Sequence, residues 1–239
     1  MEIIDSVEVF SRLDELRTAV FGNPVKILPD TFLLKFDKNH YRFGNGYVLK
    51  HRNQRDLVLI DAVKEEHRET LQRYVENGFK IKAILITHRD LLEQAYKPVK
   101  DIARDLDTNY FIHPLDSNGD DRALDITGYH DTFKAFDLSI FHLPGHTNGS
   151  VVIYCGLNKA LFTGDSAVGS EYGLDEYYFE RPPMESAEKD LALRESWKSL
   201  SVDFAHILPL HGKPQFDLSS EQKNQIIISL TKKEQTENL

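Results

Sequence analysis

The chain has 239 residues, of which 41% are hydrophobic, enough for the core of one large domain or of two small ones. Its one cysteine, Cys155, excludes an intrachain disulfide, and its apolar runs are too short to span a bilayer. The net charge of −9 argues against a nucleic-acid partner, because phosphate backbones attract Lys and Arg. From the single cysteine and the short apolar runs we expect a cytoplasmic protein without a membrane partner.

The first half of the chain alternates strand-like and helix-like segments. Its apolar runs predict strands at 31–36, 46–50, 56–60, 83–86 and 110–113. Helical periodicity predicts a helix at 64–77, capped at its C-terminus by Gly78, and a second helix at 99–106. This alternation is typical of a layered α/β domain.

The second half is richer in strands. We predict strands at 137–143, 150–154, 160–162 and 207–210, and a helix at 186–200. An amphipathic helix is expected after Ser219, followed by a polar tail at about 231–239. Because neither a low-complexity linker nor a repeat interrupts the chain, we predict a single domain over residues 1–239.

Polar side chains that can bind a metal follow several predicted strands. Asp61, His88, Asp165 and His211 each end an apolar run, and His146 lies in a glycine-rich turn between two strands. Strand ends are held rigidly by the core, which preorganises a metal site. Histidine together with carboxylate suits Zn, Fe or Mn, and a carboxylate placed between two cations can bridge them.

Five short phrases carry a resemblance to a known family. In chain order they read LVLIDAV, ILITHRD, LPGHTNGSVVIY, LFTGDSAVG and LPLHGKP, around Asp61, His88, His146, Asp165 and His211. With these phrases, residues 46–214 resemble the metallo-β-lactamase superfamily, which includes glyoxalase II-like and flavodiiron-like proteins. The resemblance implies a four-layer αββα sandwich of two mixed β-sheets, with a metal site along one edge.

One motif departs from the family pattern. Where the family usually reads His-x-His-x-Asp-His, this chain has Asp90 in the second His position, Leu92 in the Asp position and Glu93 in the final His position. The resemblance then implies one metal held by His88, Asp90, His146 and Asp165. A second metal would take Glu93 and His211, with Asp165 bridging. We expect one or two divalent ions, one rather than two, with the extra carboxylates favouring Fe or Mn over Zn; a site without metal is the alternative.

Several of these residues have a second interpretation. Asp90 is equally suited to cap a helix beginning at Leu91, and Glu93 to interact with the dipole at the start of that helix. Asp61 is either an outer-shell group that orients a ligand or a turn former. His67 lies in polar surroundings and is predicted to face solvent, as is Lys213, because lysine is usually exposed.

The expected function is that of a metal-dependent hydrolase acting on a small-molecule ester, thioester or lactone. Asp165 and His211 are its candidate catalytic residues. A non-catalytic binding protein and an iron-dependent oxidoreductase of the same fold are the alternatives. The aromatic segment 168–184 either lines the active site, where Arg181 could bind an anionic group, or forms a packed loop or a homodimer contact.

Overall fold

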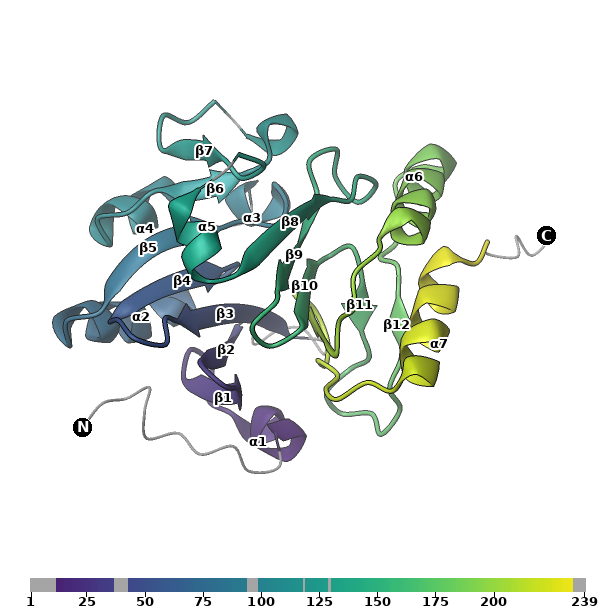
Figure 1. Cartoon of the computed structure of the whole chain (residues 1–239), viewed down its shortest axis with the longest axis horizontal. Coiled ribbons are helices and arrows are strands. Elements are labelled where there is room, and N and C mark those ends of the chain that lie inside the picture. The colour runs from purple at the N-terminus through teal and green to yellow at the C-terminus, as the bar shows by residue number, and fades with distance from the viewer. Residues whose placement is uncertain (1–11, 37–42, 94–98, 118, 129, 234–239) are drawn as a thin grey trace.

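The computed structural model describes residues 12–36, 43–93, 99–117, 119–128 and 130–233 (Figure 1). Seven strands form one sheet in chain order: β1 (Pro24–Leu28), β2 (Thr31–Phe36), β3 (Gly44–Lys50), β4 (Asp56–Ile60), β5 (Lys80–Leu85), β6 (Tyr110–Ile112) and β7 (Ala123–Asp125). Neighbours are antiparallel from β1 to β4 and parallel from β4 to β7.

The second sheet has four strands. Its order is β13 (His206–Pro209), β10 (Ala160–Gly164), β9 (Val151–Cys155) and β8 (Leu138–His142), with β10 and β13 parallel and the other pairs antiparallel. A short antiparallel pair, β11 (Val168–Gly169) and β12 (Phe179–Glu180), lies beside it. Both main sheets are therefore mixed, as expected.

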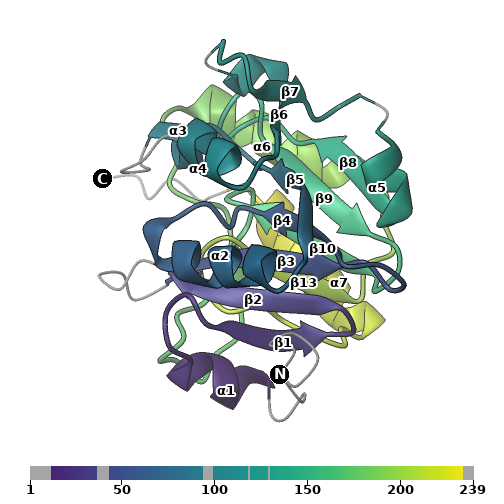
Figure 2. The same ribbon diagram turned by 90° about the vertical axis from the view of Figure 1, so that its left-hand side faces the viewer.

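Seven helices pack around the two sheets in the described part of the chain. They are α1 (Arg12–Thr18), α2 (Arg68–Glu76), α3 (Asp90–Glu93), α4 (Val99–Asp105), α5 (Asp131–Ala135), α6 (Ala187–Ser199) and α7 (Ser220–Thr231), with 3-10 turns η1 (Glu65–His67) and η2 (Pro114–Asp116). Helices α2 and α4 cover the outer face of the larger sheet, and α6 and α7 flank the smaller one (Figures 1 and 2). Among the described segments, no helix is both long and apolar enough to cross a membrane.

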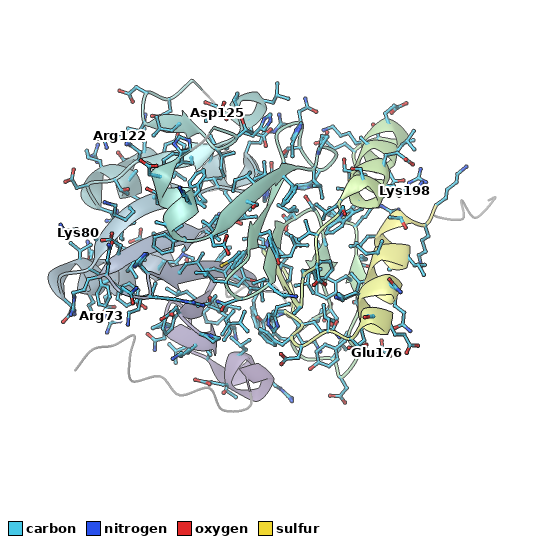
Figure 3. All side chains as sticks on the ribbon, viewed as in Figure 1. Arg73, Lys80, Arg122, Asp125, Glu176 and Lys198 are labelled. Carbon is cyan, nitrogen blue, oxygen red and sulfur yellow. The ribbon has the colours of Figure 1, made fainter. Side chains whose placement is uncertain are left out.

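Three hydrophobic layers hold these elements together. Tyr74 of α2 belongs to the layer between the larger sheet and helices α2 and α4. Tyr47 and Phe162 meet between the two sheets. Leu161 of β10 and Trp197 of α6 belong to the layer between the smaller sheet and its helices. Adjacent residues on β10 thus point into different layers, as the period of a strand requires. Charged side chains such as those of Lys80 and Lys198 lie at the periphery (Figure 3). The result is the predicted αββα sandwich.

Both sheets end at a common edge. The carboxyl ends of parallel β4 and β5, and of parallel β10 and β13, lie where the polar residues follow. The Val151 amide donates to the Thr87 carbonyl at 2.9 Å, and the Asn45 amide donates to the Leu210 carbonyl at 2.7 Å. These bonds fasten one sheet to the other beside the predicted metal ligands.

The helix predicted at 64–77 is divided into two parts. Residues 65–67 form η1, and α2 begins only at Arg68 and ends at Glu76, before Gly78 adopts a φ of +82°. The expectation that His67 faces solvent is wrong, because its side chain is fully buried. Its Nδ1 accepts a hydrogen bond from the Lys64 amide at 3.2 Å, and its ring packs edge-on against Phe36. The strands β1 and β7 and helix α5 were not predicted.

The buried His67 ring predicts an acid-sensitive fold. Burial lowers the pKa of His67 from 6.5 to about 4, so the folded protein resists protonation that the unfolded chain accepts. The stability from this group is complete above pH 6.5 and is lost as the pH falls toward 4, where the loss reaches about 3 kcal/mol. Urea unfolding at pH 7 and pH 4 should show that wild type loses more stability than His67→Gln. Equal losses would contradict the prediction.

Candidate metal centre

Three predicted ligands converge at the shared sheet edge. His88 follows β5, Asp165 follows β10, and His146 lies in the turn between β8 and β9. One ligand atom from each lies within 4.8 Å of the other two. The Oδ2 atom of Asp165 is 3.5 Å from His88 Nε2 and 3.8 Å from His146 Nε2. Among the residues with described side chains, this is the only such group of three that could hold a metal.

Two further predicted residues touch this group. Asp90 Oδ2 lies 3.2 Å from His146 Nε2, so the carboxylate of Asp90 faces the three ligands. His211 Nδ1 lies 2.6 Å from Asp165 Oδ1, the oxygen that faces away from the other two histidines. The side chain of His211 is 31% exposed and that of Asp165 11%, which puts His211 on the solvent side of the group.

Asp61 satisfies both of its interpretations. It has a φ of +54° in the turn after β4, and its two carboxylate oxygens accept the Thr87 amide at 2.9 Å and the Thr87 hydroxyl at 2.8 Å. Thr87 Oγ1 also lies 3.0 Å from His88 Nδ1. Burial raises the pKa of Asp61 to about 7, and when Asp61 is ionised the hydroxyl proton goes to it, so Oγ1 accepts a proton from Nδ1 and the lone pair of His88 lies on Nε2. The chain of bonds therefore aims a ligand-ready nitrogen at Asp165.

The electrostatics favour the metal-binding protonation states of Asp165 and His88. Burial alone would raise the pKa of Asp165, but its three histidine neighbours, His211 first, outweigh burial and hold that pKa well below its ordinary value. Burial lowers the pKa of His88 to about 4. At neutral pH Asp165 is therefore ionised and His88 neutral, the forms that bind a metal. Burial alone would lower the pKa of His146, but Asp90 and Asp165 more than compensate and raise it, which favours the protonated ring, so a bound metal would have to displace that proton.

The arrangement fits a divalent metal ion. His146 Nε2 is buried yet makes no well-formed hydrogen bond with any described residue, although Asp90 lies close to it. Ligand bonds of about 2.0–2.2 Å place neighbouring donors about 3.0–3.6 Å apart, close to the distances from Asp165 to His88 and His146. Two imidazoles and a carboxylate suit Zn, Fe or Mn. The His88, His146 and Asp165 group could thus hold such an ion.

The ligand set expected for a second metal is less complete than the set for the first. Leu92 is half-buried and packs against the outer hydrophobic layer next to Leu91, which is 3% exposed. It offers no ligand atom where the family pattern has Asp. Glu93 is the last residue of α3, but its side chain lies outside the described part of the chain. Of the described second-site candidates, Asp165 and His211 are in contact with each other.

The segment 168–184 is tied to the strand end that carries His211. Lys213, expected to face solvent, is only 5% exposed, which corrects that expectation. Its amide donates to the Ser170 carbonyl at 2.8 Å, and its Nζ lies 4.2 Å from the centre of the Tyr177 ring and donates to the Leu174 carbonyl. The ammonium group is held by this segment, which explains why burial is tolerated.

Arg181 has a structural position rather than the anion-binding role considered from the sequence. Its Nε donates to Asp190 Oδ1 at 2.7 Å, and Nη1 donates to the Leu230 carbonyl at 2.9 Å. The guanidinium therefore joins α6 to the last turn of α7, where a cation also suits the helix dipole.

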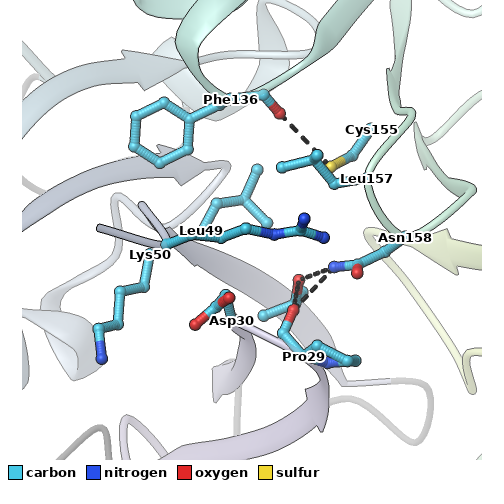
Figure 4. Close-up of a pocket in the computed structure, with 10 residues that line it drawn as sticks. Pro29, Asp30, Leu49, Lys50, Phe136, Cys155, Leu157 and Asn158 are labelled. Atoms are coloured by element: carbon cyan, nitrogen blue, oxygen red, sulfur yellow. Dashed lines mark hydrogen bonds between the residues drawn. The ribbon is translucent and has the colours of Figure 1, made fainter. Parts of the chain in front are cut away.

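A pocket away from the predicted ligands lies between the β1–β2 turn and the β9–β10 turn (Figure 4). Asn158 Nδ2 donates to the Pro29 carbonyl at 2.8 Å and to Thr31 Oγ1 at 2.9 Å. Cys155 Sγ lies 3.6 Å from the Phe136 carbonyl and is buried, as a free cysteine usually is. This pocket includes none of the candidate metal ligands.

Sequence reasoning missed two residues that shape the centre. Thr87 joins Asp61 to His88, and a hydroxyl residue between a buried strand and a candidate ligand was the available signal. Asp116 was missed as well, and it contacts the loops that carry His88 and His146. The sequence gives only a weak indication of the role of Asp116, because an acidic residue shortly after a proline is ordinary in a turn.

Comparison with known proteins gives the family. No curated protein matches the chain. The folded chain resembles ETHE1 from Myxococcus xanthus (TM-score 0.62, 15% identity, 84% of this chain and 85% of that chain). It also resembles a metallo-beta-lactamase from Pontibacter korlensis (TM-score 0.63, 18% identity, 88% of this chain and 99% of that chain). A further similar structure is a metallo-beta-lactamase from Erythrobacter litoralis (TM-score 0.61, 13% identity, 89% of this chain and 92% of that chain). At these identities the likeness concerns the fold alone. The metallo-beta-lactamase superfamily model matches residues 96–220, just over half of the chain, so the protein belongs to the metallo-beta-lactamase superfamily.

Proposed function

We propose that the protein is a hydrolase that uses one divalent metal ion to cleave a small ester, thioester or lactone. The supporting observation is the position of Asp165, whose two oxygens face different partners. Oδ2 faces His88 and His146, whereas Oδ1 contacts the half-exposed His211. A ligand cluster and a titratable group on its open side are the two parts that metal-assisted hydrolysis needs.

The residues divide the work between them. His88, His146 and Asp165 would hold the metal, with Asp90 as a fourth ligand or as the group that orients His146. When bound, the metal supplies Lewis-acid polarisation of a carbonyl oxygen and lowers the pKa of a water. Asp165 keeps its charge because its histidine neighbours hold its pKa down, so it remains a ligand across the neutral range.

His211 is the candidate proton carrier. Its Nδ1 contact with Asp165 fixes the ring orientation, and its exposed side chain is positioned to exchange a proton with a substrate or with solvent. A histidine in this arrangement typically contributes about 10²–10⁴-fold to the rate as a general acid or base. Replacing it should therefore reduce kcat while leaving the bound metal in place.

Reconstitution tests the proposal. Metal-free protein would be loaded separately with Zn, Mn or Fe(II), the last anaerobically, and assayed on p-nitrophenyl acetate, an acyl thioester and a γ-lactone. We expect hydrolysis that depends on metal, is lost in Asp165→Ala and is reduced in His211→Gln without loss of metal. Binding of metal with no hydrolysis of any substrate would contradict the hydrolase. Failure to bind any metal would favour the non-catalytic alternative.

An iron-dependent oxidoreductase is the second candidate, supported by one observation. Two histidines and one carboxylate form the ligand set typical of mononuclear non-haem iron, and Leu92 stands in the family's place for a second-metal ligand. Oxygen uptake by the Fe(II)-loaded protein in the presence of small thiols, absent from the Zn-loaded protein, would favour this candidate over the hydrolase.

Restoring the family residue at position 92 tests the single-metal assignment. Leu92→Asp restores the carboxylate that the family pattern has at this position, and Leu92 is half-buried rather than fully enclosed, so the change is tolerable. We expect metal content to rise from about one equivalent toward about two, because two-metal sites share a bridging carboxylate. Elemental analysis would measure it, with the neutral Leu92→Asn as control. An equal content in both variants would contradict the assignment.

A further inference from the structure

We infer that Asp116 positions the two loops that carry the metal ligands, an inference that rests on the proposed metal site. The first loop, residues 87–90, holds His88 and Asp90, and the second, residues 144–150, holds His146. Asp116 comes from a third segment, the η2 turn after β6, and its side chain is 2% exposed.

The carboxylate of Asp116 bonds to both loops at once. Its Oδ2 accepts the Arg89 amide of the first loop at 3.1 Å and also accepts the Thr147 hydroxyl of the second. Its Oδ1 accepts the Gly149 amide at 2.9 Å. Arg89 lies between the two candidate ligands of the first loop, and Thr147 directly follows His146. Two of the three donors are thus immediate chain neighbours of the candidate ligands, and Gly149 follows three residues after His146.

The second loop reinforces this connection from within. Ser150 Oγ accepts the Thr147 amide at 3.0 Å and lies 2.7 Å from the Thr147 hydroxyl. The backbone on both sides of Thr147 is thereby fixed relative to Asp116. A ligand set must be held to within about 0.5 Å of its productive geometry, and supporting hydrogen bonds provide this.

Only a carboxylate of this length satisfies all three donors. Asn offers a single acceptor oxygen, so one backbone N–H would face an NH₂ group, and a buried unsatisfied donor costs about 1–3 kcal/mol. The close approach of Gly149 shows how tightly the group is enclosed, because a Cβ there would lie 2.6 Å from Asp116 Cγ. The side chain and its surroundings fit each other.

A purely structural role makes a different prediction from a positioning role. If Asp116 only stabilised the fold, its loss would lower unfolding free energy and leave the metal affinity of the folded protein unchanged. If it positions the ligands, affinity falls as well, because outer-shell changes typically weaken metal binding about 10–100-fold. Affinity measured on folded protein separates the two.

The chain offers a matched control. Thr147→Val and Thr70→Val make the same chemical change, and both threonines are 2% exposed. The Thr147 hydroxyl donates to Asp116, whereas the Thr70 hydroxyl donates to the Gly22 carbonyl at 2.7 Å, on the α2 side of the larger sheet. Each hydroxyl has a second partner as well, Ser150 Oγ for Thr147 and Arg73 Nη2 for Thr70, so each variant loses two hydrogen bonds, but only Thr147 is connected to the ligand loops.

The experiment compares wild type, Asp116→Asn, Thr147→Val and Thr70→Val. Zinc Kd would be measured by competition with a chromophoric chelator, and the Co(II) absorption spectrum would report ligand geometry. Hydrogen exchange of the metal-free proteins would follow residues 84–92 and 143–151. We expect Asp116→Asn to weaken zinc binding about 10–100-fold and to loosen both segments. Thr147→Val should show a smaller change in the same direction, and Thr70→Val should keep the wild-type Kd.

The outcomes separate this inference from the proposed function. A wild-type Kd and Co(II) spectrum in Asp116→Asn would overturn the role of Asp116 while leaving the metal site. Absence of zinc or cobalt binding by wild type would overturn both. A weakened Kd in Asp116→Asn, with no hydrolysis by any metal form, would support the positioning role and overturn only the hydrolase.

Discussion

Replacement of Asp165 by alanine is expected to abolish metal binding and all metal-dependent activity. Of the residues that the structure describes, Asp165 alone contacts His88, His146 and His211 together, so its loss removes both the ligand charge and the bond that orients His211. The loss of affinity should exceed about a hundredfold, the upper end of the effect seen when an outer-shell partner is removed. Zinc competition and elemental analysis would measure it.

A surface aspartate provides the control for this prediction. Asp203 has a side chain that is 66% exposed and pairs with Lys159 and Lys223, so Asp203→Ala removes the same group without touching the centre. Its metal content should equal that of wild type. Full metal content in Asp165→Ala would contradict the prediction, because it would show that the ion is bound elsewhere in the protein.

Replacement of Gly145 by alanine is expected to destabilise the fold and displace His146, the next residue. Gly145 has a φ of +148°, which L-residues rarely adopt, and a Cβ there would lie 2.5 Å from Leu193 Cβ and 2.8 Å from the Leu193 backbone nitrogen in α6. Strain of about 1–3 kcal/mol and overpacking of similar size should together reduce the unfolding free energy by about 2–6 kcal/mol. Urea unfolding would measure this loss.

Gly173→Ala is the matched control for the glycine change. A Cβ at Gly173 would meet no atom within 4 Å, so the same substitution should leave stability within about 0.5 kcal/mol of wild type. Metal content measured on the folded fraction of Gly145→Ala should fall, because His146 follows the strained peptide. Equal stability of the two variants would refute the role assigned to this close contact.

The sandwich and most of the centre could be predicted because their signals are local. Apolar runs ending in Asp61, His88, Asp165 and His211 identify strands and the residues at their ends, and strands that run parallel bring such ends to one edge. The αββα layers followed from family resemblance rather than from periodicity. The three ligands that converge were all among the predicted ones.

The residues that were mispredicted or missed depend on contacts between distant segments. His67 has polar sequence neighbours and Lys213 carries a charge, but β2 and the segment after Asp165 cover these two side chains in the folded chain. Asp116 meets Arg89 and Thr147 across two other elements. Sequence periodicity describes only which face of its own element a residue occupies, so partners of this kind are invisible to it.

Because the two sheets meet at one edge, a metal ion bound there would also cross-link them. His88 follows a strand of the larger sheet, whereas His146 and Asp165 flank strands of the smaller one. An ion shared by them would join the two sheets only while the chain is folded, so, unlike a disulfide, it would stabilise the native state by mass action and leave the unfolded chain unconstrained. In a chain whose single cysteine rules out an internal disulfide, metal supply would then set how long the two halves stay together, and with it the lifetime of the folded protein.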